Sequence, residues 1–305
     1  MPKSVKIQVP GTTANCGPGF DAVGIACSIY NDLELILTTD RGLTIELSGE
    51  GQDTIPKDQR NVVWQAICTV FKKIGFECQG AHLKMNNRIP LSRGLGSSAA
   101  AIVAGLMAAN AVTGMQLTKN DIMDLATTIE GHPDNVAPAI FGGITLSIVE
   151  NLAEKHAHCL RFIPPAPLNM IVAVPDFVLS TKAARQVLPE FVPHKDATFN
   201  VSRTALLVGA LCQGEFSYLK HALDDKLHQP YRRKLITGMD DVFRAAMEHG
   251  ALGSAISGAG PCLIAFATQN QNAIGEAMVK AFLSHDIYSY FLVLNIDTDG
   301  AKIIS

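Results

Sequence analysis

The feature of this sequence that most constrains its fold is the glycine- and serine-rich segment at residues 90–101, which reads PLSRGLGSSAAA. Residues 81–85 before it alternate apolar and polar, and an apolar run follows it as far as Thr113. These patterns predict a strand, a glycine loop and a helix, in that order. Ser97 and Ser98 stand where the N-cap of the helix is expected.

Such a segment has two readings. Glycine lets the backbone approach a ligand closely, and the first turn of a helix offers unpaired N–H groups at a positive dipole end, which together favour a phosphate-binding loop. The other interpretation is a capped, buried helix after a flexible turn. The glycine-serine pattern by itself favours neither interpretation over the other. An ordinary P-loop is excluded because the loop contains no lysine.

A dinucleotide-binding fingerprint is a weaker alternative. Gly94, Gly96 and Ala99 satisfy its glycine spacing. That motif, however, requires a second strand that ends in an acidic residue about twenty positions later. Here residues 118–130 predict another helix, with a capping box formed by Thr118 and Asp121.

The rest of the chain alternates strand and helix patterns without a strict βαβ repeat, so we predict an α+β fold. Expected strands are residues 4–9, 28–38, 43–47, 144–149, 170–174, 262–267 and 288–295. One expected helix is capped by Asn61 and ends at residue 73, and a short one starts at residue 180. The other expected helices are residues 119–130, 202–211, 236–249 and 273–283. Residues 151–167, with three prolines near their end, are the expected boundary between domains at 1–163 and 164–305.

Composition narrows the function classes. The net charge is −3 and no basic block is present, so we expect no nucleic-acid partner. The longest apolar run, residues 99–113, is shorter than the roughly twenty residues that a membrane span needs, and the N-terminus has no signal-peptide pattern. The seven cysteines are odd in number and never spaced Cys-x-x-Cys, which favours a reducing, cytoplasmic location without metal clusters or disulfides.

The glycine loop resembles the phosphate loop of the GHMP superfamily of small-molecule kinases. The superfamily pattern, Pro-x-x-x-Gly-Leu-Gly-Ser-Ser-Ala, is matched at every fixed position from Pro90 to Ala99. Within the superfamily, the full set of motifs resembles the homoserine kinase family over most of the chain. These motifs are residues 15–21, 90–100, 130–135, 180–182 with Arg185, 230–232 and 257–261; Cys16 and Cys262 replace a commoner leucine and threonine.

This resemblance implies a fold and an activity. The expected fold is a two-domain one, with a left-handed βαβ crossover in the N-terminal domain and a ferredoxin-like C-terminal domain. The expected activity is ATP- and Mg²⁺-dependent phosphorylation of the L-homoserine hydroxyl, in threonine biosynthesis, by a homodimer. The alternatives are a kinase of another small alcohol such as mevalonate, a dinucleotide-binding oxidoreductase, or a nucleotide-binding module without catalysis.

The resemblance also assigns residues. It implies Ser98 and Glu130 as Mg²⁺ ligands, both of them hard oxygen donors. It implies ATP contacts from Asn61, Pro90, Leu91, Ser92, Arg93, Gly94, Leu95, Gly96, Ser97, Ser98, Ala99 and Ala100.

Homoserine is a zwitterion, so its site needs charges of both signs. Asp21 suits the ammonium, and Arg185 and Arg232 suit the carboxylate, because guanidinium binds carboxylate in a planar fork. Asn15, His132 and Asn135 are implied as further polar contacts.

Proton transfer is the remaining question. Mevalonate-type relatives carry a catalytic aspartate where this chain has Asn135, and an amide is not a useful base near neutrality. Asn135 is therefore expected to orient the hydroxyl. Either Asp134 or the γ-phosphate takes the proton, and we favour the γ-phosphate, late in a loose transition state.

Overall fold

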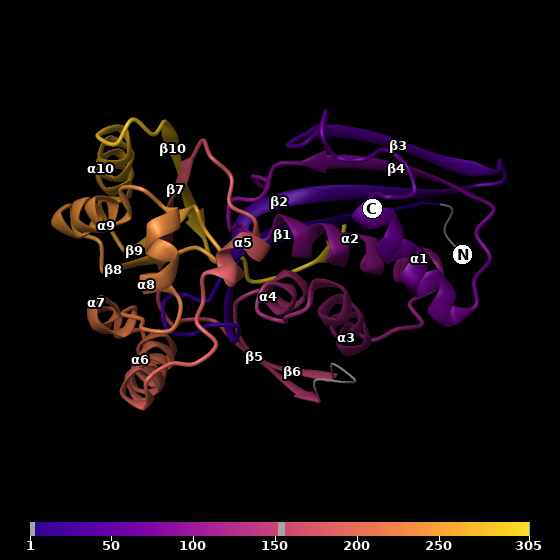
Figure 1. Ribbon diagram of the computed structural model, residues 1–305. Helices are drawn as coiled ribbons and strands as arrows, with labels where there is room; N and C mark the ends of the chain where they lie inside the picture. The colour runs from indigo at the N-terminus through magenta and orange to yellow at the C-terminus, as the bar shows by residue number, and fades with distance from the viewer. Residues whose placement is uncertain (1–3, 152–155, 305) are drawn as a thin grey trace.

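The computed structural model describes residues 4–151 and 156–304, which form two sheets with their helices (Figure 1). In the first sheet the strand order is β11-β1-β2-β4-β3, while β5 pairs with β2 and β6 pairs with β5. Its strands are β1 (Ser4–Ala14), β2 (Val23–Thr38), β3 (Gly42–Gly49), β4 (Gly80–Asn87), β5 (Ile144–Asn151), β6 (His156–Phe162) and β11 (Lys302–Ile303). The second sheet holds β7 (Asn169–Pro175), β8 (Gly253–Ile256), β9 (Leu263–Ala267) and β10 (Ser289–Asn295). The fold is thus a two-domain α+β fold, as predicted.

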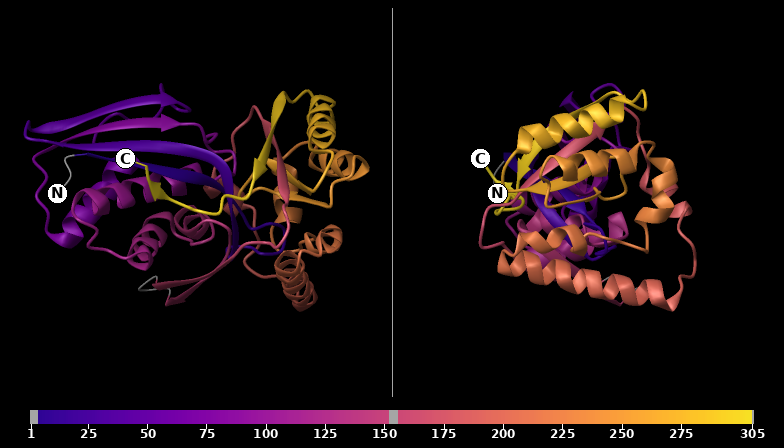
Figure 2. Two further views of the ribbon diagram at one scale, coloured as in Figure 1. Left: turned by 180° about the vertical axis from the view of Figure 1, so that it is seen from behind. Right: turned by 90° about the vertical axis from the view of Figure 1, so that its left-hand side faces the viewer.

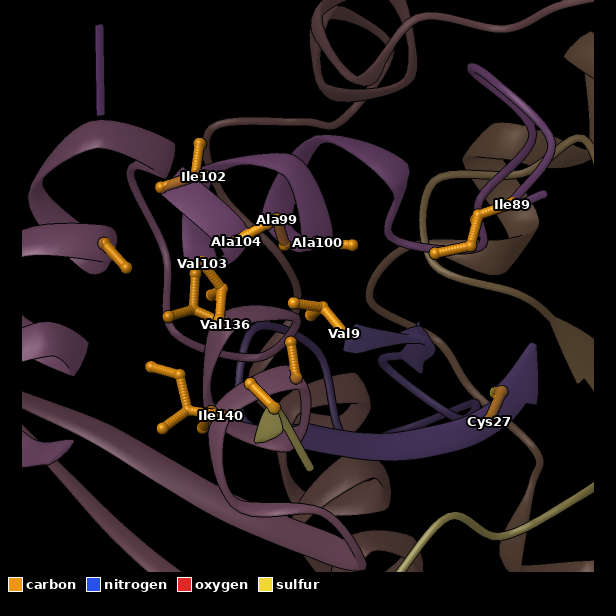
Figure 3. Close-up of a cluster of buried hydrophobic side chains, with 14 of the residues drawn as sticks. Val9, Cys27, Ile89, Ala99, Ala100, Ile102, Val103, Ala104, Val136 and Ile140 are labelled. Atoms are coloured by element: carbon orange, nitrogen blue, oxygen red, sulfur yellow. The ribbon is translucent and has the colours of Figure 1, made fainter. Parts of the chain in front are cut away.

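Helix α2 (Ser97–Val112) is the centre of the N-terminal domain. It lies with α1 (Val62–Ile74), α3 (Lys119–Glu130) and α4 (Val136–Phe141) on one face of the first sheet (Figures 1 and 2). Of its 16 residues, 13 are buried, because the helix is apolar on all sides and small residues let its neighbours approach. Figure 3 shows its side chains gathered with Val9 of β1 and with Val136 and Ile140 of α4.

Strands β3 and β4 are parallel neighbours and α1 connects them. The amide of Asn61 caps that helix, accepting hydrogen bonds from the backbone N–H groups of Val63 and Trp64 at 2.9 and 3.4 Å, as the sequence predicted. This β-α-β unit corresponds to the predicted crossover, and the left-handedness of the crossover stays a prediction.

The C-terminal domain has the ferredoxin-like order of elements. Its sheet runs β10-β7-β9-β8 with every pair antiparallel. Helices α9 (Met239–Glu248) and α10 (Gln271–Leu283) supply the two connections of a β-α-β-β-α-β unit. The remaining helices are α5 (Thr181–Gln186), α6 (His194–Gln213), α7 (Leu219–Ala222) and α8 (Gln229–Arg232), with 3₁₀ turns at Phe216–Tyr218 and Arg233–Leu235.

The chain returns to the first domain at its end. The last strand, β11, pairs with β1, and the Tyr30 hydroxyl donates a hydrogen bond of 2.9 Å to the Asp297 carboxylate. The predicted division between residues 163 and 164 falls in the connection from β6 to β7 and stays a prediction. No helix among the described residues is long and apolar enough to span a membrane.

Several element boundaries were predicted wrongly. The first strand does not stop before Pro10-Gly11 but continues to Ala14, because a register shift between these two residues accommodates the proline. The helix expected at 202–211 begins at His194, and the one expected at 236–249 begins at Met239. Strands β6, β8 and β11 and helix α4 were not predicted, since each is short or has a mixed pattern that only pairing and packing stabilise.

Candidate active site

A cavity of about 180 Å³ lies where loops of both domains meet. It is lined by every residue that the sequence assigned to the metal, to the substrate or to catalysis. These are Asn15, Asp21, Ser98, Glu130, His132, Asn135, Arg185 and Arg232. They come from five segments that are far apart in the chain, so the tertiary fold alone brings them together.

The glycine loop reaches the cavity through Ser92, Gly94, Gly96, Ser97 and Ser98. The helix cap was predicted wrongly: Gly96 is the N-cap, with φ of +67°, and the two serines are the first helical residues. The left-handed backbone favours glycine at this position, and a Cβ atom there would lie 1.9 Å from Thr12 Oγ1. Neither serine side chain therefore caps the helix.

Backbone N–H groups of this loop are available to an anion. In the described part of the chain, none of the N–H groups from Gly94 to Ala99 donates a hydrogen bond to a protein acceptor, whereas the N–H of Ala100 donates to Gly96 O at 2.9 Å. They lie at the N-terminus of the sixteen-residue α2, where the helix dipole favours negative charge. Phosphate binding fits this geometry.

The second glycine loop, residues 257–260, supports the first. Gly94 O accepts a hydrogen bond of 2.6 Å from Ser257 Oγ, and Arg93 O accepts one of 3.1 Å from the Cys262 N–H. A Cβ atom on Gly94, where φ is +81°, would lie 2.1 Å from Ser257 O. The sequence predicted this loop as a motif, but its supporting role was missed because it depends on a contact 163 residues apart.

Ser98 and Glu130 meet at the edge of the cavity. The Ser98 hydroxyl donates a hydrogen bond of 2.8 Å to Glu130 Oε2, which stands at the last residue of α3. A hydroxyl and a carboxylate are the hard oxygen donors that Mg²⁺ prefers. The pair therefore fits the predicted metal site.

Asn135, Asp134 and His132 form a hydrogen-bonded group before α4. Asn135 Oδ1 accepts a hydrogen bond of 2.8 Å from Thr12 Oγ1, a partner that no sequence pattern indicated. Asp134 is 1% exposed, and its Oδ1 lies 2.6 Å from His132 Nδ1. Burial by itself lowers the pKa of His132, but the Asp134 carboxylate outweighs this effect, so that the pKa is raised.

Asp21 and Arg185 form a two-pronged ion pair at the mouth of the cavity. The Arg185 nitrogens Nη2 and Nη1 lie 2.6 and 3.0 Å from Asp21 Oδ1 and Oδ2. Asn15 holds the loop that carries Asp21: its Oδ1 accepts from the Asp21 N–H at 3.0 Å, and its Nδ2 donates to Gly258 O at 2.8 Å. Asn15 is thus engaged with protein groups on both sides of its amide.

Arg232 is the second guanidinium of the cavity, and it is only 1% exposed. It donates hydrogen bonds to Ala184 O at 3.2 Å and to Gly258 O at 2.9 Å, and its Nη1 lies 3.2 Å from His228 Nδ1. Burial, and then the charge of Arg185, lower the pKa of Arg232 to about 10, so that it stays charged at neutral pH.

Asn61 does not reach this cavity. Its side chain is fully buried, and its Nδ2 donates to Pro56 O at 2.8 Å while its Oδ1 caps α1. Other loop residues assigned to ATP also lie outside the lining; these are Pro90, Leu91, Arg93, Leu95, Ala99 and Ala100. Their assignment to ATP stays a prediction.

Comparison with known proteins points to one superfamily. The family model of the GHMP kinases N terminal domain matches residues 61–143, and that of the GHMP kinases C terminal matches residues 207–285. The homoserine kinase of Desulfitobacterium hafniense is 42% identical over 302 residues, covering 98% of this chain and 100% of the relative. That of Moorella thermoacetica is 45% identical over 276 residues, covering 90% of this chain and 92% of the relative.

Solved structures agree with these sequence matches. The homoserine kinase of Cytophaga hutchinsonii superposes with a TM-score of 0.90 at 32% identity, covering 100% of this chain and 98% of that one. The L. major mevalonate kinase, solved with R-mevalonate, superposes with a TM-score of 0.72 at 19% identity, covering 94% of this chain and 95% of that one. At this low identity the second likeness shows a shared fold alone.

Proposed function

The chain belongs to the homoserine kinase family of the GHMP kinases, and we propose that it transfers the γ-phosphoryl group of ATP to the hydroxyl of L-homoserine. The product, O-phospho-L-homoserine, places the reaction in threonine biosynthesis. The observation that carries this proposal is one cavity that combines a phosphate-type loop, an oxygen-donor pair and charges of both signs.

ATP would bind with its phosphates on the N–H groups of the glycine loop, from Gly94 to Ser98. Mg²⁺ would be held by Ser98 and Glu130, whose oxygens are 2.8 Å apart, and would supply neutralisation of the phosphate charge. Positioning and electrostatic stabilisation are the main demands of phosphoryl transfer, and the dipole of α2 contributes to both.

L-Homoserine would be held by its two charges. Its ammonium would bind the Asp21 carboxylate, and its carboxylate would bind Arg185 and Arg232. His132 and Asn15 complete the polar wall around it. Mevalonate has a carboxylate but no ammonium, so it offers no cation of its own to Asp21, which favours an amino-acid substrate.

Asn135 would orient the hydroxyl. Its Oδ1 accepts the Thr12 hydroxyl hydrogen and its Nδ2 donates to Asp134 Oδ1 at 3.4 Å, so the second Nδ2 hydrogen is the one left to donate to the substrate oxygen. A hydroxyl that accepts this bond can direct its own proton to a γ-phosphate oxygen. The Asp134 carboxylate, by contrast, is buried and engaged by His132. We therefore assign the proton to the phosphate.

Two substitutions test this assignment. Asn135→Leu should lose much of kcat while the protein still folds and binds ATP. Asp134→Asn should keep substantial turnover and the wild-type shape of the kcat–pH profile, because no base is removed. Loss of turnover in a folded, ATP-binding Asp134→Asn protein, with an acidic limb in the wild type, would make Asp134 the base.

The activity itself is tested by ADP release with L-homoserine, L-serine, L-threonine and mevalonate in parallel. We expect the highest kcat/KM with L-homoserine. A preference for mevalonate would move the chain to another small-alcohol kinase, and nicotinamide binding without ATP turnover would support the oxidoreductase alternative. Light scattering of the purified protein tests the proposed homodimer.

A further inference from the structure

The two groups assigned to opposite ends of the substrate are bound to each other. Asp21 and Arg185 make two hydrogen bonds, of 2.6 and 3.0 Å, and each side chain is about one-third exposed, at 36% and 35%. In the described part of the chain, the Arg185 guanidinium makes no other hydrogen bond. A substrate with an ammonium and a carboxylate therefore competes with this ion pair for both groups.

The two arginines of the cavity differ in their freedom to move. Arg232 is held by Ala184 O, Gly258 O and His228, and is almost fully buried. Arg185 stands on the six-residue helix α5, and among the described residues its only ion-pair partner is Asp21. Both guanidinium carbons lie 5.4 Å from the centre of the Phe20 ring, which flanks the two cations. Arg232 is thus a fixed anchor, and Arg185 is the adjustable one.

We propose that L-homoserine binds by exchange with this ion pair: its ammonium replaces Arg185 on Asp21, and its carboxylate replaces Asp21 on Arg185. This inference rests on the proposed function and adds a specificity device to it. One ion pair is opened and two are formed, so every charge keeps a partner.

The exchange penalises alcohols that carry a single charge. 4-Hydroxybutyrate, which is homoserine without its ammonium, can take Arg185 only by leaving Asp21 unpaired. 3-Aminopropan-1-ol, which lacks the carboxylate, leaves Arg185 unpaired in the same way. An unpaired charge in a partly buried site costs more than the missing contact itself. The ion pair therefore selects a zwitterion more strongly than two independent contacts would.

The first test measures the inhibition constant of 4-hydroxybutyrate against L-homoserine, by ADP release, in the wild type and in Asp21→Asn. Asn accepts the left-handed backbone found at Asp21, where φ is +56°, so the substitution is not expected to strain the loop. We expect Asp21→Asn to lower kcat/KM for L-homoserine roughly ten- to hundredfold and to bind 4-hydroxybutyrate about tenfold more tightly than the wild type. Unchanged or weaker binding of 4-hydroxybutyrate would overturn the proposal.

The second test examines the ion pair without any ligand, because Asp21→Asn also removes simple repulsion of a carboxylate. Thermal unfolding is measured for Asp21→Asn, Arg185→Gln and the double variant. We expect non-additivity, with the double variant losing less Tm than the sum of the two single losses. Additive losses would overturn the proposal even if 4-hydroxybutyrate binding improved.

A matched control is the exposed ion pair of Arg233 and Asp240, whose side chains are 59% and 51% exposed outside the cavity. Arg233→Gln and Asp240→Asn should leave the inhibition constant of 4-hydroxybutyrate unchanged. The outcomes separate the two proposals: no phosphorylation of L-homoserine by the wild type refutes the proposed function, whereas phosphorylation with additive unfolding losses refutes the exchange alone.

Discussion

Replacement of Gly96 by alanine tests whether close packing around the glycine loop positions the Asn135 amide, which we propose orients the substrate hydroxyl. Gly96 has φ of +67°, and a Cβ atom there would lie 1.9 Å from Thr12 Oγ1 and 3.1 Å from Asn135 Oδ1. Thr12 must therefore move, and its 2.8 Å hydrogen bond to Asn135 is lost. The left-handed backbone costs about 1–2 kcal/mol for alanine, and the lost hydrogen bond and the displaced side chain add about 1 kcal/mol or more each.

These contributions sum to about 3 kcal/mol or more, which corresponds to a Tm loss of about 5 °C or more in a chain of 305 residues. Misplacement of the amide by about 1 Å should lower kcat about a hundredfold. The matched control is Gly75→Ala. Gly75 has a similar φ of +70°, but nothing lies within 4 Å of its Cβ position.

The assay is differential scanning calorimetry together with ADP release at saturating ATP and L-homoserine. Gly75→Ala should lose only about 1.5–3 °C, because it bears the backbone cost alone, and should keep near wild-type kcat. Equal Tm losses and equal kcat in the two variants would refute the reasoning, since steric contact at Gly96 would then have no consequence.

Three further predictions follow from the same cavity and from the C-terminal tail. Glu130→Gln should lower turnover far more than ATP affinity, and near-normal turnover at saturating Mg²⁺ would contradict the metal assignment. Arg232→Ala should lower kcat/KM for L-homoserine by roughly one to two orders of magnitude. It should also lower Tm, because the buried Arg232 side chain donates hydrogen bonds to two backbone carbonyls. Arg233→Ala, at an exposed arginine, should change neither kcat/KM nor Tm. Burial, and then its hydrogen bond to Asp297, raise the pKa of Tyr30 to about 12. The pKa of Tyr30 in the folded protein exceeds that of a free phenol, about 10. The stability that the neutral Tyr30 hydroxyl contributes is therefore present below pH 10 and is lost as pH rises through 12. The difference in Tm between wild type and Tyr30→Phe should be smaller at pH 11.5 than at pH 8.

Local sequence determined much of this protein. The order strand, glycine loop and buried helix is visible in residues 81–113, because it depends on the period of apolar residues and on the backbone freedom of glycine. The caps of α1 and α3 at Asn61 and Thr118 were likewise predicted, since a capping side chain acts within three residues of itself. The family motifs named the residues that line the cavity, but not how they contact one another.

Only the tertiary structure decided those contacts. The partner of Asp21 is 164 residues away in Arg185, and the partner of Asn135 is 123 residues away in Thr12. The N-cap of α2 was mispredicted because packing of Thr12 against Gly96 selects a left-handed glycine, which frees Ser98 for Glu130. Strands β6 and β11 were missed for the same reason: a short strand acquires its stability from the partner that the fold supplies, which local pattern does not encode.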